Sequence, residues 1–397
     1  MTDQAILTLN AGSSSLKLAL YAATGDAAMA TGLIDRIGAE GSLRLRDASG
    51  ADIAVETKPA DFASHAAALR MVLAALDRNF DGLRIVAVGH RVVHGGPDHD
   101  APILLDTASI DRLEKLNPLA PLHQPHNIAG IRAAHEAFPE AAQIACFDTA
   151  FHRAQPFVND TYALPREYYD RGVRRYGFHG LSYEYISGEM ARSLPELAKG
   201  RVVVAHLGNG ASMCAIAEGR PVSTTMGFSA LDGLAMGTRT GQIDPGVLLY
   251  LLDHEKLSLA DLSDLLYRRS GLLGMSGLSN DMRTLEASDD PNAKLAIDYF
   301  VTRIRRETAS LAAAMGGIDA LIFCGGIGEN SRLIRASACE GLDWMGITLD
   351  PTRNQRNEPE ISAEASPVKV LVMPTNEELV IARATRRLAI GTERTAA

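Results

Sequence analysis

One local pattern occurs twice in this sequence: two apolar, strand-length runs flank a turn of small residues. In the first copy, the runs 5–9 and 16–21 flank Asn-Ala-Gly-Ser-Ser-Ser at 10–15. In the second, the runs 202–207 and 213–217 flank Gly-Asn-Gly-Ala-Ser at 208–212. Each copy predicts a β-hairpin. The repetition indicates two halves that are built alike.

The rest of the chain alternates short apolar runs with amphipathic helical patterns. We predict further strands at 84–88, 143–147, 321–324 and 368–373, and helices at 62–76, 128–138, 258–269, 294–315 and 376–388. This alternation is typical of α/β proteins. The 397 residues suffice for two or three domains. The segment 156–175 has no clean period, and it predicts a crossing between domains.

Composition excludes several classes of function. The chain has 39 Lys and Arg against 48 Asp and Glu, a net charge of −9, so nucleic acid and anionic membrane are not expected partners. The four cysteines form no C-x-x-C pair, which indicates free thiols in a reducing compartment. No secretion signal or apolar span of about 18 residues is present. We therefore expect a cytoplasmic protein.

Three turns have the composition that a phosphate group requires, since small residues let backbone N–H groups approach an anion. They lie at 10–17, which ends in Lys17, at 206–212, and at 325–330 directly after a predicted strand. No lysine follows a glycine, so the P-loop motif is absent, and neither Gly-x-Gly is completed at the dinucleotide-binding spacing. Paired phosphate turns in two similar lobes are the layout of the actin, hexokinase and Hsp70-type ATPases.

Eleven short motifs, in order along nearly the whole chain, resemble those of the acetokinase family. They lie at 10–17, 90–96, 119–123, 147–152, 174–180, 206–210, 236–239, 271–276, 281–283, 323–330 and 375–379. The resemblance implies a two-lobed, duplicated actin/hexokinase-like (ribonuclease H-like) α/β fold with a central cleft. It also implies Mg²⁺-dependent, reversible transfer of the ATP γ-phosphoryl group to acetate, giving acetyl phosphate and ADP. The expected partners are ATP or ADP, a small carboxylate and a second copy in a homodimer, with Mn²⁺ as an alternative metal.

The resemblance further implies lobes at 1–150 and 151–379, with helix 380–397 completing the first lobe. The first lobe would bind the acyl substrate, and the second the nucleotide. The reaction brings two anions together, and a carboxylate nucleophile needs no strong base, so cations and metal are expected around the reacting atoms.

The family's functional roles fall on matching positions of this sequence. The implied catalytic residues are Arg91, Asp148, His179 and Arg239, and the implied acyl-substrate residues are Arg91, Val93, Leu122, His123 and Phe178. Phosphate contacts fall on Ser13, Ser15, Lys17, His206, Leu207, Gly208, Asn209 and Gly210, and adenosine contacts on Asp281, Met282, Arg283, Gly325, Gly326, Ile327, Gly328 and Glu329. The metal ligands, direct or through water, would be Asn10, Asp148 and Glu377.

Each assignment has a structural alternative. Asp148 could cap the segment that follows its strand, and Glu377 could be a first-turn acid favoured by the helix dipole. His90 with His94, and His123 with His126, have spacings that suggest zinc, but no His-Glu-x-x-His motif or Cys partner supports such a site.

The sequence departs from the family pattern at the acyl pocket. Many members carry Pro where this chain has Ala230, in Phe-Ser-Ala-Leu at 228–231. Alanine leaves more room beside the substrate methyl group. Propionate is therefore the alternative substrate, and a non-catalytic nucleotide-binding protein of the same fold is the alternative from another class.

Overall fold

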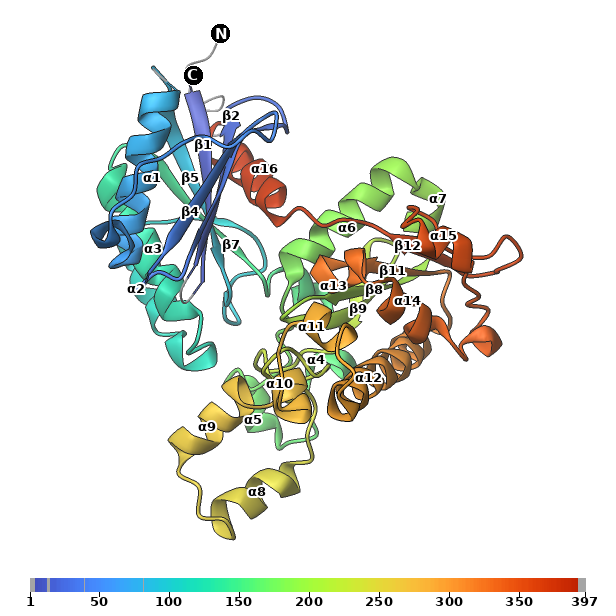
Figure 1. Cartoon of the computed structure of the whole chain (residues 1–397). Coiled ribbons are helices and arrows are strands. Elements are labelled where there is room, and N and C mark those ends of the chain that lie inside the picture. Colours follow the sequence, from blue (N-terminus) through green and yellow to red (C-terminus); the bar gives the residue numbers. More distant parts are fainter. Residues whose placement is uncertain (1–3, 13–14, 39, 81, 392–397) are drawn as a thin grey trace. The chain divides into compact units, whose positions relative to one another are not determined.

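The computed structural model describes residues 4–12, 15–38, 40–80 and 82–391. It divides the chain into two compact units. Unit 1 comprises residues 1–151 and 376–397, and unit 2 comprises residues 152–375. Each unit is a β-sheet with helices packed against it (Figure 1).

Unit 1 is built on a seven-stranded mixed sheet with the order β4-β3-β2-β1-β5-β7-β6. Its strands are β1 (Gln4–Ala11), β2 (Leu16–Ala22), β3 (Ala28–Asp35), β4 (Ser42–Asp47), β5 (Arg84–Val92), β6 (Ile103–Leu104) and β7 (Ala142–Phe147). The strands β1 to β4 form an antiparallel meander, and β5 and β7 extend it with parallel pairing. The first predicted hairpin is confirmed, because β1 pairs with β2 from Ala5↔Ala22 to Ala11↔Leu16.

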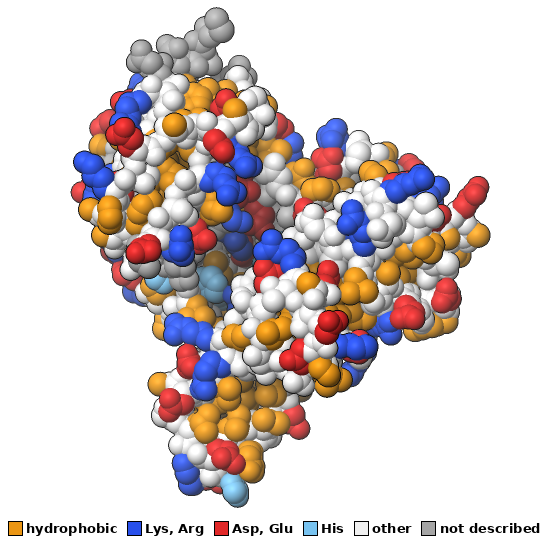
Figure 2. Space-filling model, viewed as in Figure 1, with side chains coloured by type: hydrophobic (Ala, Val, Ile, Leu, Met, Phe, Trp, Pro, Cys, Tyr) orange, Lys and Arg blue, Asp and Glu red, His pale blue; other side chains and the backbone are white. Residues whose placement is uncertain are grey.

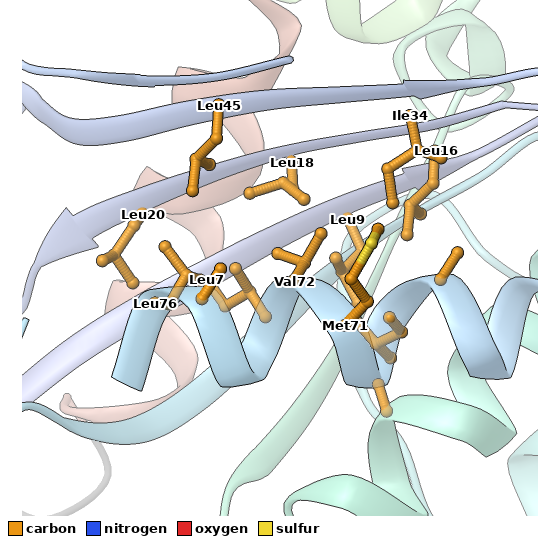
Figure 3. Close-up of a cluster of buried hydrophobic side chains, with 14 of the residues drawn as sticks. Leu7, Leu9, Leu16, Leu18, Leu20, Ile34, Leu45, Met71, Val72 and Leu76 are labelled. Atoms are coloured by element: carbon orange, nitrogen blue, oxygen red, sulfur yellow. The ribbon is translucent and has the colours of Figure 1, made fainter. Parts of the chain in front are cut away.

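The helices of unit 1 lie on both faces of this sheet (Figure 1). They are α1 (His65–Asn79), α2 (Thr107–Glu114), α3 (Gln124–Ala137) and α16 (Glu377–Ala389), with 3-10 turns η1 (Pro59–Phe62) and η2 (Asn117–Leu119). Figure 3 shows the core under α1, where Met71, Val72 and Leu76 meet the sheet residues Leu7 and Leu18. The other face receives α16, and Gly89 of β5 permits this approach because a Cβ there would lie 2.1 Å from Thr385 Oγ1.

Unit 2 is built on a five-stranded sheet with the order β10-β9-β8-β11-β12. Its strands are β8 (Arg201–Leu207), β9 (Ala211–Ala217), β10 (Arg220–Thr224), β11 (Ala320–Cys324) and β12 (Lys369–Val372). The second predicted hairpin is also confirmed, because β8 and β9 pair antiparallel from Arg201↔Ala217 to Leu207↔Ala211. The turn is shorter than predicted, since Ala211 and Ser212 belong to β9.

Helices surround the sheet of unit 2, with the long α12 against β8 and β9. They are α4 (Phe157–Asp160), α5 (Arg166–Asp170), α6 (Gly180–Ser193), α7 (Pro195–Ala198), α8 (Pro245–Asp253), α9 (Leu259–Arg268), α10 (Gly271–Ser276), α11 (Met282–Glu286), α12 (Pro291–Met315), α13 (Gly325–Asn330), α14 (Arg332–Cys339) and α15 (Pro351–Gln355). The 3-10 turns are η3 (Phe151–Ala154), where the chain passes between the units, and η4 (Asp343–Met345).

Three predicted elements require correction. The segment 325–330, predicted as a turn, is the short helix α13. The helix predicted from residue 62 begins at His65, because the Ser64 side chain caps it and Phe62 lies in η1. The helix predicted at 128–138 begins one turn earlier, at Gln124, with Pro125 in its first turn, where the missing N–H costs nothing.

The four cysteines are buried and carry free thiols. Within the described part of the chain, no helix is both long enough and apolar enough to cross a membrane.

Candidate active site

A cluster of oxygen atoms surrounds Arg91 at one end of the sheet in unit 1. Arg91 near the end of β5 donates from Nε and Nη2 to the two carboxylate oxygens of Asp148, at 2.9 and 2.7 Å. Its Nη1 lies 3.5 Å from Oδ1 of Asn10, on β1, and 3.4 Å from a carboxylate oxygen of Glu377, in the first turn of α16. Four predicted site residues that are far apart in the sequence are thereby brought together.

The electrostatics of this cluster favour a fixed positive charge. The Asp148 side chain is 2% exposed and that of Arg91 is 19% exposed, so solvent screens their attraction weakly. Burial alone would lower the pKa of Arg91, but the carboxylates of Asp148 and Glu377 outweigh burial and raise it. The two-pronged contact with Asp148 also fixes the plane of the guanidinium.

The same oxygen atoms are the expected metal ligands. Among the residues that the structure describes, no group of three or more His, Cys, Asp and Glu side chains is arranged to hold a metal ion. The predicted set contains two carboxylates and one amide oxygen, and all three converge on Arg91. Such hard oxygen donors fit Mg²⁺, which usually keeps several waters and takes further ligands from substrate phosphates.

Neighbouring backbone in unit 1 is held in place by residues that the sequence analysis did not single out. Buried Asn127 on α3 donates to the carbonyl of Ala11 at 2.7 Å and accepts from the Val93 N–H at 3.0 Å. It therefore ties the end of β1 to the residue after β5. Nε2 of His65 lies 2.7 Å from the carbonyl oxygen of Gly12. Single polar residues on helices give no local sequence signal of such contacts.

The other predicted residues of unit 1 lie around this end of the sheet. Lys17 is exposed and faces Asn10 directly across β1 and β2. Val93 is buried, whereas Leu122 and His123 are half-buried just before α3. The predicted phosphate contact Ser13 lies outside the described residues, and Ser15 is half-buried directly before β2.

Histidines of the two pairs whose spacing suggested zinc make contacts with other protein groups. Buried His90 makes a 2.8 Å contact from Nε2 to Oε1 of Gln143, and Nδ1 of His94 accepts the Gly96 N–H at 2.8 Å. The ring of His126 lies beside that of His65, with 5.6 Å between centroids.

In unit 2, His179 is held in a fixed orientation over a predicted phosphate turn. It has a positive φ of 57°, a costly conformation for a residue other than glycine, directly before α6. Nδ1 lies 2.8 Å from Oγ of Ser212, and the ring stacks on His206 with 4.3 Å between centroids. A Cβ at Gly210 would lie 3.2 Å from Nε2, so this nitrogen faces the backbone of the turn.

Two of the predicted nucleotide segments adjoin in unit 2. The turn after β8 is closed by a 3.0 Å hydrogen bond from the Gly208 N–H to the Gly210 carbonyl. A Cβ at Gly325, which has a φ of 76°, would lie 2.7 Å from the carbonyl oxygen of Leu207. Glycine is therefore required where α13 begins beside the end of β8.

Arg239 and the segment 281–283 are linked to the same turn. The Gly237 N–H donates to the Asn209 carbonyl at 2.9 Å, and the Asn280 amide donates to Oδ1 of Asn209 at 3.2 Å. Half-buried Arg239 donates from Nη1 to the carbonyl of Ala230 at 3.2 Å. Asp281 caps α11 and forms an ion pair with Arg283, whose side chain is 90% exposed.

Glu329 has structural partners within unit 2. Its Oε1 accepts the N–H groups of Gly325, at 2.9 Å, and of Thr375, at 3.2 Å. The hydroxyl of Ser182 bridges Thr375 Oγ1, at 2.9 Å, and His206 Nδ1, at 2.8 Å. The Glu329 carboxylate thus orders the backbone around the predicted nucleotide segment.

Sequence reasoning missed Arg335, which is fully buried on α14. Its Nη1 donates to the carbonyls of Gly328 and Glu329 at 2.9 Å each, and its Nε donates to Oδ1 of Asn354 at 2.9 Å. Burial, and then the nearby charge of Arg332, lower the pKa of Arg335 to about 10. This arginine secures the C-terminal end of α13, and only its burial, which the sequence does not reveal, distinguishes it from a surface arginine.

Comparison with known proteins shows the family of this chain. The family model of the acetokinase family matches residues 5–383. The chain belongs to the acetokinase family. It is 54% identical over 396 residues to the acetate kinase of Methylocella silvestris, covering 97% of this chain and 98% of that protein. It is 52% identical over 390 residues to that of Nitrobacter hamburgensis, covering 97% and 96%.

Solved structures give the same family. A propionate kinase from Francisella tularensis matches with a TM-score of 0.90 and 38% identity, covering 97% of this chain and 99% of that one. The acetate kinase of Porphyromonas gingivalis matches with a TM-score of 0.85 and 38% identity, covering 96% and 98%. The expected actin/hexokinase-like α/β fold is confirmed, and the chain is a kinase whose phosphoryl acceptor is a carboxylate.

Proposed function

We propose that this protein catalyses reversible, Mg²⁺-dependent transfer of the γ-phosphoryl group of ATP to acetate, giving acetyl phosphate and ADP. The observation that carries the proposal is the half-buried Arg91, whose guanidinium is fixed by both oxygens of Asp148 beside Asn10 and Glu377. A fixed cation among oxygen donors suits a reaction in which an anionic acceptor must approach an anionic phosphate.

The proposed acyl-binding residues lie in unit 1, apart from Phe178. Arg91 would attract the substrate carboxylate, which is ionised at neutral pH and needs no proton removed before it attacks phosphorus. Asp148 would hold the guanidinium in orientation. Val93 and Leu122 supply apolar surface for the methyl group, and His123 is a supporting polar residue.

The proposed nucleotide-binding residues lie in unit 2, together with Lys17 and the serines of 13–15 in unit 1. The segment from His206 to Gly210 would bind the β- and γ-phosphates, and the segments 281–283 and 325–329 the adenosine. His179 and Arg239 would stabilise charge on the phosphoryl group during transfer. Support comes from Nε2 of His179, which faces the backbone of Gly210.

Asn10, Asp148 and Glu377 would hold Mg²⁺, or Mn²⁺ in its place, directly or through water. When bound, the metal neutralises phosphate charge. The residues of this chain contribute two carboxylates and an amide oxygen, which match the preference of the ion for hard donors.

We further propose a cytoplasmic homodimer. The helix α8 supports self-association because Val247, Leu249 and Tyr250 are exposed on it, at 41%, 67% and 50%. Figure 2 shows hydrophobic side chains gathered over α8 and α9. Contiguous apolar surface of this kind is typical of interfaces.

The function is tested by the acid that the enzyme phosphorylates. With saturating ATP and Mg²⁺, we expect acyl phosphate, trapped as the hydroxamate, from acetate and from propionate, with kcat/KM values within roughly tenfold of each other. Butyrate should be clearly poorer, because a rigid pocket rejects longer chains. Chelation of the metal should abolish the reaction, and added Mg²⁺ should restore it. Failure of the purified protein to form acyl phosphate from either acid contradicts the proposal.

Propionate is the second candidate substrate because residue 230 is alanine and one structural neighbour is a propionate kinase. Ala230→Pro is expected to shift preference toward acetate, since the ring fills space beside the substrate methyl group. In apolar pockets, one methylene group typically changes kcat/KM by about 10- to 200-fold. An unchanged ratio of kcat/KM for the two acids, in a variant that melts like the wild type, would show that residue 230 does not set acyl size.

A further inference from the structure

The loop that carries Ala230 is held at both ends by a small group of side chains outside the residues assigned so far. At its start, the N–H of Phe228 donates to the hydroxyl oxygen of Tyr162 at 2.7 Å. At its end, Asp232 accepts the Gly233 N–H through Oδ1 at 2.9 Å and pairs through Oδ2 with Nη1 of Arg175 at 3.0 Å.

These two anchors are themselves joined. The guanidinium carbon of Arg175 lies 4.7 Å from the centre of the Tyr162 ring, in a cation–π contact. The Arg175–Asp232 pair is partly exposed, with side chains 31% and 29% accessible, so its charge alone contributes little. The value of the arrangement lies in its geometry, because one arginine contacts the residues that hold both ends of the loop.

The side chains of Tyr162 and Asp232 both pack against the backbone of Gly227. A Cβ there would lie 2.2 Å from the Tyr162 hydroxyl oxygen and 2.6 Å from Oδ2 of Asp232. The Gly227 carbonyl accepts the N–H groups of Tyr176 and Gly177 at 3.0 and 3.2 Å. The loop with Ala230 is thereby hydrogen-bonded to the segment that leads into buried Phe178, the other pocket residue proposed in unit 2.

The loop also contacts the catalytic machinery, since Arg239 donates to the Ala230 carbonyl at 3.2 Å. A displacement of the loop would therefore move Ala230, a residue of the proposed acyl pocket, and alter the support of Arg239. We propose that Tyr162, through its hydroxyl, is a positioning residue that fixes the loop 227–232 and so sets acyl selectivity. This inference rests on the proposed function.

The direction of the effect follows from the anchoring. A fixed loop resists the extra methylene of propionate, whereas a loosened loop yields to it and positions acetate less well. Tyr162→Phe removes one oxygen atom and keeps the ring against Arg175. Because a single hydrogen bond is worth about two- to tenfold in an equilibrium, we expect the propionate-to-acetate ratio of kcat/KM to rise roughly threefold or more.

The matched control is Tyr169→Phe. Tyr169 also lies against an arginine, with the Arg174 guanidinium 4.5 Å from its ring centre, and its hydroxyl donates to Asp160 at 2.8 Å. Its hydroxyl partner is not on the loop 227–232. We expect this variant to leave the acid ratio within about twofold of the wild type. Asp232→Asn should shift the ratio in the same direction as Tyr162→Phe, and it serves if Tyr162→Phe does not fold.

The test measures kcat and KM for acetate, propionate and ATP, together with thermal melting. Support is a raised propionate-to-acetate ratio in Tyr162→Phe and Asp232→Asn with an unchanged KM for ATP. The inference is overturned if the ratio stays at the wild-type value in the folded variants. It is also overturned if Tyr169→Phe shifts the ratio equally, or if activity toward both acids and ATP affinity fall together. A wild type that is inactive on both acids would instead refute the proposed function.

Discussion

Replacement of Asp148 by asparagine is expected to lower kcat by about 10²–10³-fold, the usual loss when one fixed electrostatic group is removed from an active site. In the structure, both carboxylate oxygens of Asp148 accept hydrogen bonds from Arg91, at 2.9 and 2.7 Å. An asparagine offers one oxygen and one N–H₂ group, so one of the two contacts becomes donor against donor. The change also removes the negative charge proposed to help hold Mg²⁺.

A decisive comparison uses a second pair of the same geometry. Asp319 accepts from Nε and Nη2 of Arg201 at 3.0 and 2.8 Å, and it lies among none of the proposed site residues. Asp319→Asn should keep kcat within about twofold of the wild type, as expected for a change at a partly exposed ion pair. Near-normal kcat/KM in Asp148→Asn would contradict the role of Asp148.

Stability must be separated from catalysis in this experiment. Breaking a buried ion pair by removing one partner costs about 3 kcal/mol, so Asp148→Asn should also melt at a lower temperature. Assays well below the melting midpoint, with folding checked by circular dichroism, isolate the kinetic effect.

Arg91→Leu and Arg239→Leu should likewise impair turnover. Lysine at either position should restore turnover only in part, because an ammonium group lacks the planar fork of a guanidinium.

The free energy of unfolding is expected to fall steeply as the pH drops from 6.5 to about 4. Burial lowers the pKa values of His90 and His152 to about 4 each, against about 6.5 in the unfolded chain. Between these values the unfolded chain binds more protons than the folded one, so stability rises with pH. The contribution is fully present above pH 6.5 and is lost toward pH 4, about 3 kcal/mol for each histidine.

Burial keeps both rings neutral, and the hydrogen bonds of His152 are those of a neutral imidazole. Nε2 of His152 lies 2.9 Å from the carbonyl oxygen of Phe178, and Nε2 of Gln155 lies 3.2 Å from its Nδ1. With Nε2 as the donor, Nδ1 accepts from Gln155, and protonation of Nδ1 would break that bond. Both nitrogens are thus satisfied by the neutral ring.

Urea unfolding between pH 4 and 8 measures the effect. His90→Gln can keep a donor toward Gln143 but cannot titrate, so its stability should decline less over the acid range than that of the wild type, by about 3 kcal/mol. His254→Gln is the matched control, because the His254 side chain is 73% exposed. The free energy of unfolding of this variant should vary with pH as that of the wild type does. Parallel curves for His90→Gln and the wild type would show that His90 does not carry this dependence.

Features that depend on neighbouring residues could be predicted from the amino-acid sequence. Two hairpins with small-residue turns and the alternation of strands and helices could be predicted, because strand period and turn chemistry act over a few residues. The candidate site residues came from the resemblance of short motifs to those of the family. Helix starts were less predictable. The first turn of α3 lies at Gln124 and not at residue 128, since its early residues are polar and carry no apolar period.

Which charged side chains contact one another depends on the folding of the whole chain. Asp148 is 57 residues from Arg91 in the sequence and Tyr162 is 66 residues from Phe228, and nothing local distinguishes these side chains from surface ones. The order of strands in the sheet brings Arg91 beside Asp148 and Asn10, and burial of Arg335 turns an ordinary arginine into the support of α13. Such contacts depend on which segments pack together. Residues far apart in the sequence set burial and the order of strands, so packing is a property of the whole chain.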